Sequence, residues 1–387
     1  MKKNILIAAI ALAGFAADAQ QTLTIIEQDY ELAKRTAAAQ HKLLIIDCYT
    51  SWCLPCKLLD KMIFKNDSIS AEISKDFVVL KYDAEQDTKH NLSLKHHICS
   101  YPTTVVLTAE GRVIGKMYGT GSGGALVENY NKLLQESISR NKQGAYLTGY
   151  TTAINADQYP DFYKKYVRRI SDIKPGELAR YWSDNKDLLS EVSFAVLFYF
   201  GRAPRHVADF FLQHKAEYEK RFGTADTRFV LHNMSAEKFS VAIEEKDEKK
   251  YEDAVAFAQQ HLVSADAGEL INAYRLNLFI ALEKWEEATQ IVAERIRLKK
   301  ANEHEINNFC WNVYEKCQNK KTLSEAAQFM KAVVDANPSF ATLDTYARLL
   351  AKNGKRQEAV TVMQRAIEMG KANGEQTKES EEALGKL

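Results

Sequence analysis

The sequence predicts an α/β domain, with a central mixed sheet flanked by helices, followed by an all-helical region. In the first third of the chain, short apolar runs alternate with stretches of helical spacing, the order expected of a sheet with helices on its faces. Beyond Arg140, glycine and proline become scarce and long stretches keep helical spacing. A pair of cysteines, Cys53 and Cys56, lies where a predicted strand passes into a helix. This pair is typical of a thiol-disulfide redox centre.

Each predicted element has its own signal in the chain. The run 42–49 is almost wholly apolar, which is typical of a buried strand. Glu110-Gly111-Arg112 predicts a hairpin turn, and the glycine-rich segment 119–124 separates the last strand from a closing helix. The expected order is a helix at 29–41, a strand at 42–49, a helix from Cys53 through Ile63, strands at 77–82, 103–108 and 113–118, and a helix through Leu126, Tyr130, Leu133 and Leu134.

The first 19 residues have the pattern of a secretory signal peptide. Lys2 and Lys3 precede an apolar run over 5–17, and Ala17-Asp18-Ala19 offers a small-residue cleavage pattern. The apolar run is shorter than the roughly 20 residues that a membrane span needs. We therefore expect cleavage near Ala19 and a mature protein that is exported, to a bacterial periplasm, and does not span a membrane.

Charge and length narrow the class of protein. The 387 residues carry 52 Lys and Arg against 51 Asp and Glu, a neutral balance that provides no field for nucleic acid. The length exceeds what a single hydrophobic core usually accommodates, so two or more domains are expected. The six cysteines are too few for a disulfide-built scaffold. We expect a signal peptide at 1–19, a redox domain at 20–140, a helical region at 141–249 and helical repeats at 250–387.

Residues 25–140 resemble the thioredoxin family, in particular the thioredoxin-like domains of exported and membrane-linked disulfide reductases. The resemblance rests on residues in the family's order: Asp47, Trp52, the Cys53 to Cys56 pair with Pro55, and Pro102 before a strand. It implies that Pro102 is cis and faces the cysteine pair across the active-site groove. It also implies that the backbone of Tyr101 pairs with an extended substrate peptide and that Pro102 keeps metal away from the cysteines.

The cysteine pair suits thiol-disulfide exchange. A thiolate is the attacking species, and a cysteine at a helix N-terminus has its pKa lowered by free backbone N–H groups and the helix dipole. Cys53 is therefore the predicted nucleophile. Cys56 lies one turn further along the helix and is the predicted resolving thiol. Pro55 suits the first helical turn, where Lys57 is also expected to support the helix start.

The other candidate site residues each have two interpretations. The resemblance implies that Asp47 helps to move the proton of Cys56, whereas a purely structural Asp47 would be satisfied by Lys57 or water. Trp52 is expected to shield the pair and to contribute to the substrate surface, although a packing role is equally open. Pro102, with Tyr101 before it, is either part of the groove or an ordinary turn.

Further cysteines and two histidines lie near this region. Cys48 follows Asp47 on one strand, so its side chain is expected on the opposite face as a buried, inert thiol. Cys99 lies in the loop before Pro102, where redox involvement stays open. A zinc site built from the cysteine pair with His96 and His97 is disfavoured because adjacent histidines diverge. We expect both histidines on the surface and no metal.

The last part of the chain holds a weak internal repeat. An acidic residue followed by alanine recurs at spacings of 34, 38 and 33 residues, in Asp253-Ala254, Glu287-Ala288, Glu325-Ala326 and Glu358-Ala359. This approaches the period of tetratricopeptide repeats, which the region resembles best over 306–371. Cys310 and Cys317 are expected to be core residues too far apart to bridge. The aromatic-rich stretch 159–200 is likewise expected to form core.

Two hypotheses of function follow. The first is a periplasmic thiol-disulfide oxidoreductase that reduces client disulfides through Cys53 and Cys56, with no organic cofactor, and that receives electrons from a partner thiol protein such as a membrane reductase. The alternative is a binding scaffold, in which the helical repeats recognise a partner and the redox domain is a docking module. A combination of the two is also open, in which the helical region raises the effective concentration of a client at the cysteine pair.

Overall fold

The computed structural model describes residues 22–119 and 125–387. The expected signal peptide at 1–19, and all but Gly119 of the glycine-rich segment, lie outside the described residues. The chain forms two compact units, one that ends at Asn233 and one that spans Met234–Leu387. The boundary between them falls inside a single helix, α11 (Thr224–Glu244).

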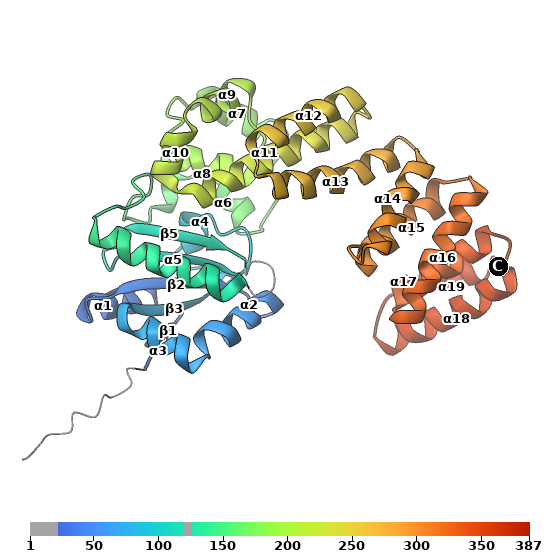
Figure 1. The fold of residues 1–387 in the computed structure, drawn as a ribbon, viewed down its shortest axis with the longest axis horizontal. Helices are drawn as coiled ribbons and strands as arrows, with labels where there is room; N and C mark the ends of the chain where they lie inside the picture. The colour runs from blue at the N-terminus through green and yellow to red at the C-terminus, as the bar shows by residue number, and fades with distance from the viewer. Residues whose placement is uncertain (1–21, 120–124) are drawn as a thin grey trace, which may run out of the picture. The chain divides into compact units, whose positions relative to one another are not determined.

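The first unit contains the expected mixed sheet (Figure 1). Its strand order is β1-β3-β2-β4-β5, with β1, β3 and β2 parallel and β4 and β5 added antiparallel. The strands are β1 (Ile25–Glu27), β2 (Leu43–Tyr49), β3 (Phe77–Asp83), β4 (Thr103–Leu107) and β5 (Val113–Tyr118). The fold class predicted from the apolar runs is thereby confirmed, because each run forms a strand within a residue of its expected place.

Helices cover both faces of this sheet. Ile45 and Val79 form one core cluster with Leu59, Tyr130 and other side chains of the flanking helices. Leu44 and Ile46 alternate with Ile45 and are fully buried on the opposite face. The helices of this domain are α1 (Tyr30–Ala39), α2 (Leu54–Leu59) with its π-helical continuation η1 (Asp60–Phe64), α3 (Asp67–Asp76), the short turn η2 (Ala84–Gln86), α4 (Leu92–Lys95) and α5 (Ala125–Lys142).

A second group of helices packs against the sheet domain within the same unit. The ring of Tyr118, at the end of β5, lies 5.9 Å from that of Phe198 and 5.6 Å from that of Phe229. Of the ten aromatic residues of the stretch 159–200, five are buried, as expected, four are partly buried, and Tyr166 is 38% exposed. The elements are η3 (Ala156–Gln158), α6 (Asp161–Val167), α7 (Glu177–Asp184), α8 (Glu191–Phe200), α9 (Arg205–Gln213), α10 (Lys215–Phe222) and the first part of α11.

The second unit is helical throughout. Its helices are the remainder of α11, α12 (Glu248–His261), α13 (Ser264–Ala281), α14 (Trp285–Arg297), α15 (Glu303–Lys316), α16 (Lys320–Ala336), α17 (Phe340–Lys352), α18 (Arg356–Ala372) and α19 (Lys378–Leu384). From α12 onward, each helix contacts the next along the chain. Cys310 and Cys317 are fully buried in this core, as predicted. Across the described ranges, no helix has the length and apolar character needed to cross a membrane.

Candidate active site

The cysteine pair stands at the start of α2, directly after β2. Cys53 is the residue that caps this helix, and the backbone N–H of Cys56 donates to Cys53 Sγ at 3.1 Å. The two cysteines form a disulfide with a Cα–Cα distance of 5.3 Å. Pro55 occupies the first turn of α2, where its missing N–H costs no hydrogen bond. The local sequence therefore positions one sulfur at the positive end of the helix and the other a turn below it.

An exposed aromatic edge lies beside the pair. Trp52 is 58% exposed, and its Nε1–H donates to Glu85 Oε1 at 3.0 Å. The ring of Tyr101 meets that of Trp52 edge to face at 6.2 Å. Two residues predicted from distant parts of the sequence are thus brought together. Exposure of the indole agrees with a surface role for Trp52 rather than packing alone.

The loop before β4 carries a cis peptide bond between Tyr101 and Pro102, as the resemblance implies. The carbonyl of Pro102 accepts from the N–H of Gly119 at 2.8 Å, which ties the loop to the end of β5. Among the described residues, neither the N–H nor the C=O of Tyr101 makes a hydrogen bond. The backbone of Tyr101 is therefore free to pair with an added strand.

Asp47 lies on β2, on the sheet face that α2 covers. Its register partner on the parallel strand β3 is Lys81, whose Nζ lies 2.5 Å from Asp47 Oδ2. Asp47 Oδ1 is buried and makes no hydrogen bond within the part of the chain described. Burial raises the pKa of Asp47, and the positive charge of Lys81 offsets this only in part. A buried carboxyl with one unoccupied oxygen can take up and release a proton.

The prediction that Lys57 would satisfy a structural Asp47 is wrong. Lys57 is exposed and makes no ion pair in the described ranges, whereas Lys81, which the sequence reasoning missed, holds the carboxylate. Lys81 Nζ also bonds Asp60 Oδ1 at 3.2 Å, and it lies over the rings of Tyr49 and Phe64. The available signal was a single lysine within the apolar run 77–82, facing the single acid of the run 42–49.

The comparisons with known proteins agree with this geometry. A family model described as Thioredoxin-like matches residues 25–109. Thioredoxin-1 of Drosophila melanogaster is 35% identical over 80 residues, which make up 21% of this chain and 70% of that protein. The chain belongs to the thioredoxin-like family.

Further relatives match about a quarter to a third of the chain. The thiol:disulfide interchange protein DsbD of Actinobacillus pleuropneumoniae serotype 5b (strain L20) is 27% identical over 93 residues, 24% of this chain and 16% of that protein. The crystal structure of thioredoxin f from spinach chloroplast has 24% identity and covers 31% of this chain and 95% of that one, with a TM-score of 0.24. The chain spans about a sixth of its DsbD relative and somewhat over two thirds of Thioredoxin-1.

The other thiols of the thioredoxin-like domain are protonated at neutral pH. Cys48 is buried on the sheet face opposite Asp47, as expected, and burial raises its pKa. Burial also raises the pKa of Cys99 to about 12. Neither thiol forms a disulfide. In thioredoxin-like oxidoreductases the redox centre is the disulfide itself, and within 22–119 and 125–387 no group of three or more His, Cys, Asp or Glu side chains is arranged to hold a metal ion.

The expected surface position of His96 and His97 is wrong. Both rings are buried, at 2% and 0% exposure. His97 Nδ1 lies 3.4 Å from Asp226 Oδ2 of α11, and its ring packs on Phe194 and Phe198. Burial lowers the pKa of both histidines. They belong to the joint between the thioredoxin-like domain and the helices that follow it, and no pattern along the chain indicates this contact.

Proposed function

We propose that this protein is a thiol-disulfide oxidoreductase that reduces disulfides of client proteins through Cys53 and Cys56. The observation that carries the proposal is the position of the pair at the start of α2, beside a cis-proline loop whose Tyr101 backbone is free of hydrogen bonds within the described residues. A client segment in an extended conformation can pair with Tyr101 and bring its sulfur to Cys53. Trp52 and Pro102 then form the walls of that groove.

The reaction consists of two exchanges. The Cys53 thiolate attacks one sulfur of the client disulfide, a bond forms to Cys53 Sγ, and the other client sulfur leaves as a thiolate that takes up a proton. The Cys56 thiolate then attacks Cys53 Sγ, which forms the Cys53–Cys56 disulfide and releases the second client sulfur as a thiol. The client gains two electrons and two protons, and the protein loses them.

Asp47 takes up the proton in the second exchange. Cys56 must lose its proton before it can attack, and the unoccupied Oδ1 of Asp47 is the acceptor. Because Lys81 holds the other carboxylate oxygen, the acceptor stays oriented on the α2 side of the sheet. Asp47 thereby acts as the general base of the resolving step.

The proposal extends to the cellular location of the protein, its electron donor and the role of its helical region. The pattern of residues 1–19 supports export to the periplasm, and the similarity to a thiol:disulfide interchange protein supports a partner thiol protein, such as a membrane reductase, that returns two electrons and two protons to the disulfide. A tetratricopeptide-like array over 250–387 is supported by the repeated alanines, which are all buried and fall on every second helix, namely Ala254, Ala288, Ala326 and Ala359. This array would recruit the client.

A trapping experiment tests the proposal. The full mature protein should reduce insulin in the presence of dithiothreitol, and Cys56→Ser should accumulate a mixed disulfide with insulin that excess reductant releases. Cys53→Ser should form no such adduct. Cys99→Ser is the matched control and should behave as wild type, because its thiol is protonated at neutral pH. Failure of wild type to reduce insulin, with no adduct on Cys56→Ser, would favour the binding scaffold.

A further inference from the structure

Two cavities open beside Tyr101, and the loop that follows α6 lines both. Their volumes are about 490 and 570 Å³, and Tyr101, Val167, Arg169 and Ile170 line both. Glu85, which accepts from Trp52, lines the first cavity, and Cys99 lines the second. Both cavities therefore begin at Tyr101, the residue before the cis-proline. The loop that lines them lies outside the region matched by the Thioredoxin-like model, 25–109.

The end of α6 holds Arg169 in a conformation that favours glycine. The N–H of Arg169 donates to the carbonyl of Tyr166, and that of Ile170 to the carbonyl of Lys165, both at 2.9 Å. This is a Schellman ending, in which the residue at the position of Arg169 is left-handed and most often glycine. Arg169 has a φ of 55° there. Glycine therefore suits this backbone position at least as well as arginine does.

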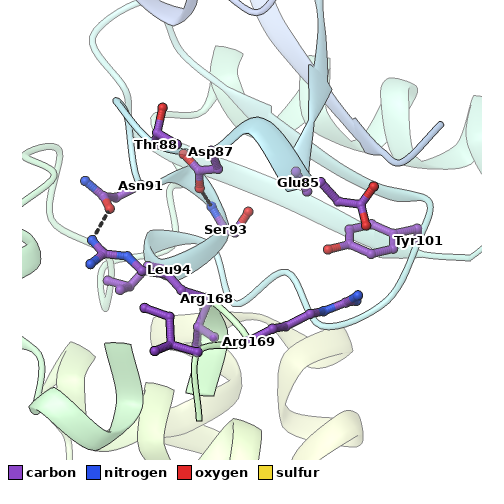
Figure 2. Close-up of a pocket in the computed structure, with 12 residues that line it drawn as sticks. Glu85, Asp87, Thr88, Asn91, Ser93, Leu94, Tyr101, Arg168 and Arg169 are labelled. Atoms are coloured by element: carbon purple, nitrogen blue, oxygen red, sulfur yellow. Dashed lines mark hydrogen bonds between the residues drawn. The ribbon is translucent and has the colours of Figure 1, made fainter. Parts of the chain in front are cut away.

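All but one of the charged side chains around the first cavity make a hydrogen bond. Figure 2 shows those of Arg168 and Asp87 as dashed lines. Arg168 donates to Asn91 Oδ1 at 2.7 Å, and Glu85 accepts from Trp52. Asp87 accepts from the hydroxyl of Tyr82 at 2.5 Å and from the N–H of Ser93 at 2.7 Å.

Arg169 is the exception. Figure 2 shows its side chain extended toward Tyr101, and within the described ranges its guanidinium makes neither a hydrogen bond nor an ion pair. Burial raises the pKa of Tyr101, and the charge of Arg169 is close enough to the phenol to offset this in part. Since Arg168 is held by Asn91, Arg169 is the cation among the described lining residues of the first cavity that is left to bind a ligand.

We infer that the loop after α6 completes the client groove and that Arg169 binds the carboxylate of an acidic residue next to the client's cysteine. The inference rests on the proposed reduction of peptide disulfides and names the class of client. A guanidinium offers a planar fork of N–H donors that matches a carboxylate. Ile170, 67% exposed beside it, offers an apolar contact to the same extended segment. The helical region thus supplies a specificity residue that the thioredoxin-like domain lacks.

The test compares two cyclic peptide disulfides that differ only in Asp or Asn beside one cysteine, with the full mature protein at low salt. Wild type should show a kcat/KM about fivefold higher for the Asp peptide, the size expected of an exposed ion pair, and added salt should reduce the preference. Arg169→Gly should abolish the preference without loss of folding, because glycine suits that backbone. Arg169→Lys should retain part of it. Lys165→Gln, which removes a cation from the exposed side of α6, is the matched control and should change nothing.

The possible results separate this inference from the proposed function. Equal kcat/KM values for the two peptides with wild type, or equal losses on both with Arg169→Gly, would overturn the role of Arg169 while leaving disulfide reduction intact. If wild type reduces neither peptide, the proposed function fails. Calorimetric titration with peptides that carry Ser in place of Cys then decides the inference alone, since weaker binding of the Asp peptide to Arg169→Gly than to wild type supports it and equal binding refutes it.

Discussion

Two buried carboxylates of the first unit have opposite surroundings. Asp226 lies in the joint between the thioredoxin-like domain and the helices, where it accepts from Lys116 Nζ at 2.8 Å, Tyr118 at 2.8 Å and Tyr150 at 2.5 Å. Asp47 lies on the sheet face that α2 covers, where Lys81 is its single partner among the described residues and one oxygen is unoccupied. Both are fully buried and both face a lysine.

The number of donors decides their chemistry. Burial alone would raise the pKa of Asp226, but Lys116 and His97 hold it well below its usual range. Burial raises the pKa of Asp47 and Lys81 does not outweigh it. A fully satisfied carboxylate stays ionised and fastens two elements together, whereas a partly satisfied one is poised to exchange a proton. The difference supports the proposed role of Asp47 as a proton acceptor, and it predicts that Asp226 stabilises the fold.

The largest expected effect is the loss of stability in Asp226→Asn. The substitution leaves the ammonium of Lys116 buried without a counter-charge, so we expect a loss of about 3–5 kcal/mol in the free energy of unfolding. Urea denaturation of the full oxidised protein measures it. Asp172→Asn, an exposed control, should change stability by less than about 0.5 kcal/mol. A loss of less than about 1 kcal/mol in the free energy of unfolding of Asp226→Asn would be well short of the cost of an unpaired buried charge. It would contradict the stabilising role of Asp226.

The next effect concerns rate rather than stability. Asp47→Asn removes the proposed proton acceptor, so resolution of the mixed disulfide at neutral pH should slow by about 10²-fold. Rapid-quench trapping of the adduct formed with a peptide disulfide measures this step. Asp60→Asn is the matched control, because Asp60 also bonds Lys81 but is not fully buried. Equal slowing in both variants would show that Lys81, rather than Asp47, controls the step.

The two carboxylates should also differ in how stability varies with pH. The folded-state pKa of Asp226 is lowered, so its contribution is present above the unfolded pKa, about 3.9, and is lost as the pH falls below it. The folded-state pKa of Asp47 is raised, so ionisation destabilises the fold as the pH rises above about 4. Unfolding measured at about pH 3.5 and about pH 7.5 should show the deficit of Asp226→Asn growing with pH.

Asp47→Asn should show the reverse sign over the same range. Its stability relative to wild type should improve as the pH rises, since asparagine cannot ionise and Asp60 still bonds Lys81 at 3.2 Å. If the stabilities of both variants relative to wild type instead change in the same direction between these pH values, the folded-state pKa values of the two carboxylates are not shifted in opposite directions.

The smallest expected effect is that of Cys99→Ser on the rate of disulfide reduction. Cys99 stands between His97 and the cis-proline, and its thiol is protonated because burial raises its pKa to about 12. Since a protonated thiol does not attack disulfides, Cys99→Ser should leave the rate of insulin reduction within about twofold of wild type. A loss as large as that of Cys53→Ser would reopen a redox role for Cys99.

Features that depend on residues close together in the sequence could be predicted, whereas contacts between residues far apart in the sequence could not. The strands, the helix start at Cys53 and the cis bond at Pro102 follow from local patterns and from the family resemblance. Lys81 is 34 residues from Asp47, and Asp226 is 129 residues from His97. Such pairs are set by strand register and helix docking, which residue patterns do not encode. His96 and His97 were expected on the surface because nothing nearby in the sequence could satisfy them.

The measurement that tests the central claim most directly is the reduction potential of the Cys53–Cys56 pair. The purified protein is equilibrated with dithiothreitol or glutathione buffers and its free thiols are trapped, with Cys99→Ser as a check that the signal comes from the pair. A value near about −270 mV is the result expected of a reductase that a partner keeps reduced. A value near about −120 mV would make the protein a disulfide donor, and would contradict the proposed direction of the reaction.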